Sequence, residues 1–481
     1  MDLTSRMTRI SCLALAAIAV MAPLADHALA DELRMEAIAL AWIEAHNSAD
    51  IETMATFRAA HRQDADDAWR GQFPGLVERL GRLEPTDVEI PGPGELILLV
   101  DSSVAGRLEF TFRFSPDDPE RIGAIGVDQV GASEDNELPV LRLDSEDWAR
   151  RTGAIDTYIA TLAAEGRFSG TVLIGQGGEV RFEGAYGEAS REFAVPNTLD
   201  TRFDIGSITK DFTRVAIAQL IGAGKLGIDD KLGEHLPDYP NAEAREKVTI
   251  RHLFEHSSGV GDYFTDEWGE TPMGALRTHW DYIDIWGPKP LAFEPGKGRS
   301  YSNFGFTILG AIIDRVSGQP YFEYVAKNVL APAGMTATGF FATDLPEPNV
   351  AVGYTLMTRG GAQGDTLRKN IYLEPVVGGP WGKTYSTARD LWRFWQELSH
   401  HRLTPAAYTS WVLLSGPPPS GPTTAGELGP VTEIGLGGGG PGLSAELLAS
   451  RGTVIIVLAN LDPPITTHLA ERLEEALASE R

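Results

Sequence analysis

The sequence predicts an α/β fold in which a small α+β domain precedes one larger, discontinuous domain. Apolar residues alternate with polar ones from Leu108 to Phe114, which indicates a half-buried strand that follows two helical segments. Further strand-like segments lie on either side of a long, mostly helical stretch from Ser207 to about Glu397. Because one sheet needs strands from both sides of that stretch, the two ends of the larger region are expected to fold together.

Composition excludes several classes of protein. The 481 residues include 41 Lys and Arg against 67 Asp and Glu, so the formal net charge is -26. Nucleic acid and anionic membrane surfaces attract basic patches, so neither is expected as the main partner. With 43% hydrophobic and 9% aromatic residues, most of the chain can form packed cores and is not disordered.

Residues 1–30 are predicted to be a signal peptide. Arg6 and Arg9 form a basic start, an apolar run from Cys12 to Ala25 follows, and Ala28-Leu29-Ala30 has the small-residue pattern of a cleavage site. The run is short for a membrane-spanning anchor, which is the alternative. We expect cleavage after Ala30 and a periplasmic or secreted protein. Cys12 is the single cysteine, so the mature chain would lack disulfides, Cys nucleophiles and thiolate metal sites.

Residues 31–130 are predicted to form the small α+β domain. Apolar residues from Leu33 to Ala45 recur at helical spacing, and a second helix is expected near Ile51. Strands follow at 96–100 and 108–114, after a Pro-Gly turn at 91–94. Two helices followed by a curved antiparallel sheet resemble the NTF2-like modules found ahead of some exported hydrolases. An acidic linker at 131–145 is expected to separate this domain from residues 146–481.

The larger domain opens with a helix that carries Ile155, Ile159 and Leu162. A hairpin at 171–182, which turns at Gly177-Gly178, follows it. The chain is expected to close with a strand at 453–459 and a helix at 465–477, and the Pro- and Gly-rich residues 415–430 are expected to form a surface loop.

Ser207-Ile208-Thr209-Lys210 is the sharpest chemical signal. If a helix begins at Ser207, then Ser207 and Lys210 lie one turn apart on one face, and the lysine amine can reach the serine hydroxyl. A serine at a helix N-terminus also lies among free backbone N–H groups. By itself the pattern is weak, because a capping serine beside a solvated lysine produces it more often.

Two later motifs give this signal its weight. Tyr301-Ser302-Asn303 precedes an apolar helix, and a glycine-rich segment at 435–442 precedes the final strand. Ser-x-x-Lys, Tyr-x-Asn and a late glycine-rich strand, in this order, resemble the serine β-lactamase and penicillin-binding-protein superfamily, in particular its class C-like esterases and D-amino-acid peptidases. This resemblance implies an αβα sandwich with an antiparallel sheet and a helical insertion.

The resemblance also implies roles for the matching residues. Ser207 would be the nucleophile that forms an acyl-enzyme, and Lys210 and Tyr301 would share the base role, with the choice between them open. Asn303 would orient the substrate amide or the Lys210 head group. The glycine strand, Gly437, Gly438 and Gly439, would contact substrate, and the N–H groups of Ser207 and Gly439 would form the oxyanion hole. No cofactor or metal is implied, and the expected partner is a small-molecule ester, amide or peptide.

Leu436 departs from the family pattern. Relatives carry Lys-Thr-Gly or His-x-Gly where this chain has Leu436-Gly437-Gly438, and leucine offers a carboxylate neither charge nor hydrogen bond. This favours an esterase-like hydrolase over a D-amino-acid peptidase or β-lactamase. A catalytically weakened binding protein of the same fold stays open, and the oligomeric state is not predicted.

Three other motifs mimic known sites. His252 and His256 fit the H-x-x-E-H zinc pattern, which leaves a zinc peptidase as an alternative. The segment 378–384 resembles a phosphate-binding loop but is one residue too short before Gly-Lys-Thr. Glycines at 435, 437 and 440 match a dinucleotide fingerprint, although no βαβ unit can follow them so near the chain's end.

Overall fold

The computed structural model describes residues 27–62, 68–71, 73–92, 94–103, 106–115, 118–129, 138–143, 145, 147–358, 363–414 and 431–478. The chain divides into two compact units, residues 1–133 and 134–481. Of the predicted signal peptide, only residues 27–30 are described, as the start of a helix, and the predicted surface loop at 415–430 lies outside the described residues.

The first unit packs helices against an antiparallel sheet. Its helical elements are α1 (His27–Asn47), α2 (Ile51–His61), the 3₁₀ turn η2 (Ala68–Gly71) and α3 (Phe73–Leu80). Its sheet has the order β1 (Leu83–Gly92), β2 (Glu95–Ser102), β3 (Gly106–Ser115), β4 (Asp118–Gln129), with every neighbouring pair antiparallel.

The predicted alternation explains the core of this unit. Trp42 of α1 lies over β3, with ring centroids 5.2 Å from Phe110 and 6.0 Å from Phe112. Both phenylalanines are fully buried, whereas Arg113, which follows Phe112 on the strand, is exposed. The predicted two helices and strands are therefore present, and the NTF2-like identity of this unit stays a prediction.

The second unit contains a five-stranded antiparallel sheet built from both ends of its chain. The order is β13 (Ile434–Gly440), β14 (Leu443–Ser450), β15 (Thr453–Ala459), β5 (Gly170–Gln176), β6 (Glu179–Tyr186). Strand β15 pairs with β14 on one side and with β5 on the other, from Thr453↔Gln176 to Ala459↔Gly170. This pairing confirms the prediction that the larger domain is discontinuous.

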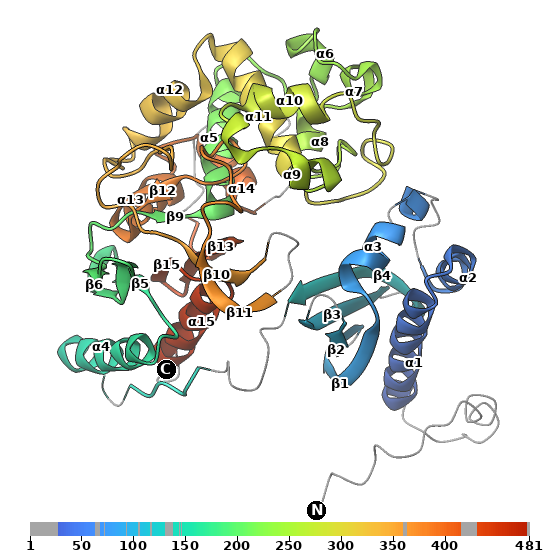
Figure 1. The fold of residues 1–481 in the computed structure, drawn as a ribbon, viewed down its shortest axis with the longest axis horizontal. Helices are drawn as coiled ribbons and strands as arrows, with labels where there is room; N and C mark the ends of the chain where they lie inside the picture. Colours follow the sequence, from blue (N-terminus) through green and yellow to red (C-terminus); the bar gives the residue numbers. More distant parts are fainter. Residues whose placement is uncertain are drawn as a thin grey trace, which may run out of the picture. The chain divides into compact units, whose positions relative to one another are not determined.

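Helices cover both faces of this sheet (Figure 1). Helices α4 (Trp148–Ala164) and α15 (Ile465–Ala478) share one core with Ile455 and Val457. Ile456 and Leu458, which point to the opposite face because strand side chains alternate, belong to the core under the helical insertion. The layers therefore form the predicted αβα sandwich.

The helical insertion lies between β6 and β13 in the chain. Its longer helices are α5 (Thr209–Gly222), α10 (His279–Trp286), α11 (Asn303–Ser317), α13 (Ala388–Ser399) and α14 (Ala406–Leu414). Its shorter elements are α6 (Leu232–His235), α7 (Ala242–Lys247), α8 (Ile250–Phe254), α9 (Asp266–Glu270), η5 (Met273–Ala275), α12 (Tyr321–Val325) and η6 (Ala326–Leu330). Helices α5 and α11 pack on one another at its centre.

Short strands surround the sheet and the insertion: β7 (Glu188–Ser190), β8 (Val195–Pro196), β9 (Phe203–Asp204), β10 (Tyr354–Met357), β11 (Gln363–Lys369) and β12 (Tyr385–Ser386). The β10–β11 hairpin lies within the stretch predicted to be mostly helical. Four residues of β10 are too few to produce a recognisable alternation.

Leu138, Leu141 and Leu143, which fall in the predicted linker, are buried in the core of the second unit. None of the helices in the described part of the chain combines the length and apolar character that crossing a bilayer requires.

Candidate active site

Ser207 lies on a tight turn between β9 and α5. Gly206 has a left-handed backbone (φ +50°), and its N–H donates to the Asp204 carboxylate at 2.9 Å. The chain then makes a 3₁₀ turn over Gly206–Ile208, and α5 begins at Thr209. The sequence predicts contact between Ser207 and Lys210 only on the condition that a helix begins at Ser207. Because the Asp204 contact and the glycine form the turn first, the regular helix starts two residues later.

The side chains of Lys210 and Tyr301 meet at the Ser207 hydroxyl. The Lys210 ammonium donates to Ser207 Oγ at 3.0 Å, and the Tyr301 hydroxyl oxygen lies 2.9 Å from the same atom. Lys210 stands in the first turn of α5, one turn after Ser207, whereas Tyr301 comes from the segment before α11. The structure therefore brings the three predicted catalytic residues into one hydrogen-bonded group.

Lys210 is buried at 2% exposure among hydrogen-bond acceptors. Its Nζ donates to Asn303 Oδ1 at 2.7 Å and to the Trp381 carbonyl oxygen, in addition to Ser207. Burial lowers the pKa of Lys210 to about 7, although the nearby Asp262 carboxylate opposes this shift. At neutral pH a large fraction of Lys210 is therefore an uncharged amine, which can accept a proton.

Tyr301 is held at the rim of the site. The residue is 53% exposed, and its ring stacks on that of His256 with centroids 4.6 Å apart. Desolvation raises the pKa of the Tyr301 hydroxyl, and the hydrogen bond with Ser207 opposes the rise only in part. The next residue, Ser302, caps α11 by accepting from Gly305 N at 2.8 Å. Tyr301 is thus a protonated phenol at neutral pH, fixed by the start of a buried helix.

The glycine-rich strand β13 packs closely against the Ser207 turn. A Cβ added to Gly438 would lie 2.1 Å from Ile205 O and 2.9 Å from Ser207 N, which leaves room only for hydrogen. The backbone nitrogen of Gly439 lies 3.0 Å from the position that a Cβ on Gly206 would take. Gly437 faces away, toward Glu446. Of the three predicted glycines, Gly438 therefore lies directly against the nucleophile turn.

Leu436 precedes these glycines on the same strand. It is 7% exposed, belongs to the core of the insertion and pairs with Leu447 of β14. Lys383 is also buried and lies near Asp204 and Glu374: burial raises the pKa of Asp204 to about 6 and that of Glu374 to about 7, and the Lys383 charge opposes both shifts. Neither residue presents a free cation to a substrate carboxylate.

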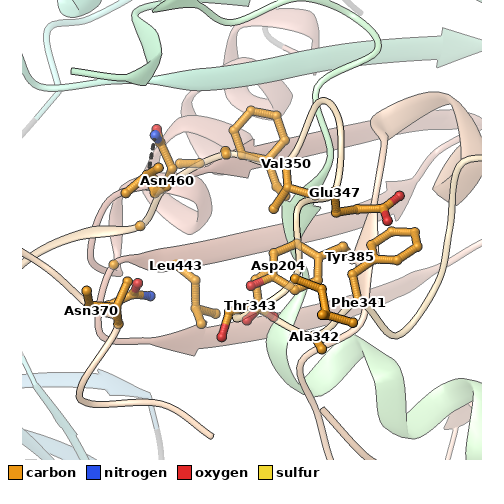
Figure 2. Close-up of a pocket in the computed structure, with 18 of the residues that line it drawn as sticks. Asp204, Phe341, Ala342, Thr343, Glu347, Val350, Asn370, Tyr385, Leu443 and Asn460 are labelled. Carbon is orange, nitrogen blue, oxygen red and sulfur yellow. Dashed lines mark hydrogen bonds between the residues drawn. The ribbon is translucent and has the colours of Figure 1, made fainter. Parts of the chain in front are cut away.

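A cavity of about 290 Å³ adjoins the strand that leads into this turn (Figure 2). Asp204, Tyr385, Leu443 and Asn460 are part of its wall, while the described residues that line it include neither Ser207 nor Lys210. Burial raises the pKa of Asp204 to about 6, against the opposing charge of Lys383. The cavity therefore lies beside the nucleophile turn and not at the serine hydroxyl.

The histidine pattern does not form the arrangement that a zinc site needs. Helix α8 ends at Phe254, and His256 has a left-handed backbone (φ +61°), so the two histidines are not one helical turn apart. His252 Nδ1 accepts from Thr249 N at 3.2 Å, and His256 Nδ1 accepts from Ser302 N at 3.1 Å. In the described part of the chain, no group of three or more His, Cys, Asp or Glu side chains is placed to hold a metal ion.

Sequence reasoning missed Asp262 and the Trp381 carbonyl. Asp262 lies in the loop between α8 and α9, and its only local signal is the pair of glycines, Gly259 and Gly261, that precedes it. Trp381 belongs to the segment that imitates a phosphate loop. A backbone carbonyl has no side-chain signature, so its contact with Lys210 could not be read from residue types.

Comparisons with known proteins find a family and several relatives for this chain. The family model described as Beta-lactamase matches residues 155–480. The chain is 32% identical over 254 residues to the putative penicillin-binding protein PbpX of Bacillus subtilis, covering 53% of this chain and 59% of that protein. It is 32% identical over 215 residues to esterase EstB of Burkholderia gladioli, covering 42% of this chain and 54% of that protein. The chain thus spans little more than half the length of these curated relatives.

Solved structures extend the likeness to about two thirds of the chain. A penicillin-binding protein from Bacillus halodurans superposes with a TM-score of 0.57 at 33% identity, over 65% of this chain and 97% of that one. A D-amino acid amidase from Ochrobactrum anthropi superposes with a TM-score of 0.56 at 24% identity, over 68% of this chain and 99% of that one. The second of these likenesses concerns the fold alone.

Proposed function

Because the chain belongs to the beta-lactamase family, we propose that it is a serine hydrolase that cleaves an ester or amide through an acyl-enzyme on Ser207. One observation carries the proposal: both Lys210 Nζ and the Tyr301 hydroxyl lie within hydrogen-bond distance of Ser207 Oγ, at 3.0 and 2.9 Å. A serine hydroxyl is a weak nucleophile until a neighbouring base takes its proton. This arrangement supplies such a base and a second group that can carry a proton.

The directions of the two pKa shifts divide the roles. Lys210, with its pKa lowered to about 7, accepts the Ser207 proton as Oγ bonds to the acyl carbon. Tyr301, whose pKa is raised, is the protonated neighbour that can pass a proton to the departing alkoxide or amine and recover one from Lys210. Water then attacks the ester carbonyl of the acyl-enzyme, with the same groups working in reverse, and releases the acid and free Ser207.

The negative oxygen of the tetrahedral intermediate needs donors that are already in place. Ser207 N, at the start of the 3₁₀ turn, and Gly439 N, on β13, are the proposed pair. The close fit of Gly438 against Ser207 N fixes the distance between the strand and the turn. Preorganised donors of this kind contribute about 3–4 kcal/mol each to transition-state stabilisation.

Trapping the acyl-enzyme tests the proposal. Wild-type protein mixed with p-nitrophenyl butyrate should release nitrophenol and gain the mass of one butyryl group on the peptide that contains Ser207. The Ser207→Ala variant should gain no such mass and release nitrophenol only at the background rate. Equal hydrolysis by the two proteins would contradict the assignment of Ser207.

Leu436 predicts a preference for uncharged acyl groups. A carboxylate brought beside a buried leucine loses hydration and gains no cation in return. We expect kcat/KM for p-nitrophenyl butyrate to exceed that for the p-nitrophenyl monoester of succinic acid by at least about tenfold, or about 1.4 kcal/mol. Leu436→Lys should lower the ratio of the two kcat/KM values, whereas the apolar control Leu436→Met should leave that ratio unchanged. Equal wild-type rates on the two esters would contradict the prediction.

A further inference from the structure

Asp262 is a half-buried acid beside the active site that takes no direct part in the proposed chemistry. Its Oδ2 accepts from Asn303 Nδ2 at 2.9 Å and from Asn303 N at 3.2 Å, and its Oδ1 accepts from Tyr263 N at 2.8 Å. Three N–H groups therefore hold the carboxylate in one place, although it lies on a loop.

These contacts determine which end of the Asn303 amide faces Lys210. The amide NH₂ donates to Asp262, so the opposite end, Oδ1, faces the lysine and accepts from Nζ at 2.7 Å. The reversed amide would set an acceptor against an acceptor at Asp262 and a donor against a donor at Lys210. Asp262 thus locks the amide in the orientation that Lys210 requires.

The locked amide in turn orients the lysine amine. A neutral amine has two N–H groups and one lone pair. Three acceptor atoms surround Nζ: Asn303 Oδ1, the Trp381 carbonyl oxygen and Ser207 Oγ. When the first two take the two N–H groups, the lone pair is left for the Ser207 hydroxyl proton. If Asn303 Oδ1 is lost, the amine can turn an N–H toward Ser207 instead.

Asp262 also acts on Lys210 through its charge. Of the charges that face Lys210, the Asp262 and Asp211 carboxylates raise the lysine's pKa, and the Arg214 guanidinium lowers it. Asp211 and Arg214 stand on α5 itself. From the segments packed against α5, neutral His256 and protonated Tyr301 add no net charge at neutral pH. Removal of the Asp262 charge therefore favours the neutral amine.

We propose that Asp262 is a positioning residue that, through the Asn303 amide, aims the lone pair of Lys210 at the Ser207 hydroxyl. This inference rests on the proposed function. The two effects of Asp262 have opposite consequences for catalysis: loss of its charge makes more of the lysine neutral, while loss of its hydrogen bonds leaves that neutral amine badly oriented.

Asp262→Asn separates these effects. We expect kcat on p-nitrophenyl butyrate to fall about 10- to 100-fold with KM unchanged within about threefold, since Asp262 does not touch substrate. The acid limb of the kcat/KM profile should move to lower pH, because the lysine loses an attractive charge. A variant that merely misfolds would lose rate without moving the limb. Asp238→Asn removes an exposed carboxylate paired with Arg315 and should change neither kcat nor the limb.

A double-mutant cycle tests the route through Asn303. In an Asn303→Ala background, Asp262→Asn should lower kcat by less than threefold but still move the acid limb, because only the electrostatic effect remains. Crystal structures of the wild type and of Asp262→Asn add a readout independent of turnover, in which the 2.7 Å contact between Asn303 Oδ1 and Lys210 Nζ should be lost. Unchanged kcat, acid limb and Asn303 position in Asp262→Asn would overturn the inference. A wild type that hydrolyses no acyl donor would overturn the proposed function instead, and the two crystal structures would still decide the role of Asp262.

Discussion

Lys210→Met is expected to lower kcat for ester hydrolysis by about 10³-fold or more, with folding retained. Methionine has a similar length and suits a site at 2% exposure, so the apolar replacement keeps the packing and removes only the amine. Without the amine, Ser207 has no buried base, and removal of a general base typically costs a factor of about 10²–10⁴. Tyr301 cannot take over at neutral pH, because its raised pKa keeps it protonated.

The pH dependence of the wild type gives the same hypothesis a second test. Since the neutral amine is the active form, kcat/KM should be low below pH 6, rise through about pH 7 and reach a plateau above pH 8. Stopped assays across pH 5–9, corrected for spontaneous ester hydrolysis, would measure the profile. Lys225→Met, which changes an exposed lysine just after α5, serves as the control and should match the wild type. A flat profile, or more than a tenth of wild-type kcat in Lys210→Met, would contradict the role of Lys210.

The parts of this site that the sequence predicted are those set by local geometry. The spacing of Ser207 and Lys210 places both on one turn, and Lys210 Nζ lies 3.0 Å from Ser207 Oγ. Tyr301 and Asn303 lie more than ninety positions later, and no periodicity connects them with Ser207. They could be assigned only because the order of three motifs resembled a known family.

The parts that could not be predicted depend on tertiary contacts. The Trp381 carbonyl reaches Lys210 from a segment whose side chains imitate a different site. Asp262 acts through an amide that is forty-one positions away in the chain. The spacing of His252 and His256 suggested two zinc ligands one helical turn apart. The turn after Phe254 instead puts His256 in a left-handed conformation, where its Nδ1 accepts from Ser302 N. Residue types show which groups are available, and only the fold shows which of them meet.

A single methyl group added to the glycine-rich strand β13 should also lower kcat strongly. Gly438→Ala would place Cβ 2.1 Å from Ile205 O and 2.9 Å from Ser207 N. Both are backbone atoms of the nucleophile turn, so no side-chain rotation can relieve the clash. Either β13 or the turn must move, and both carry a proposed oxyanion donor.

We therefore expect Gly438→Ala to lower kcat by about 10²-fold, since a displacement of about 1 Å at reacting groups has an effect of this size. Overpacking should also lower the unfolding free energy by about 1–3 kcal/mol. Gly435→Ala is the matched control: it lies on the same strand, its added Cβ would meet only Glu446 Oε1 at 3.8 Å, and its kcat should stay within about threefold of wild type. Steady-state kinetics, thermal melting and the yield of trapped acyl-enzyme would separate a displaced site from an unfolded one. If Gly438→Ala kept wild-type kcat, the strand would not set the position of Ser207, and the oxyanion donors would have to be sought elsewhere on the turn.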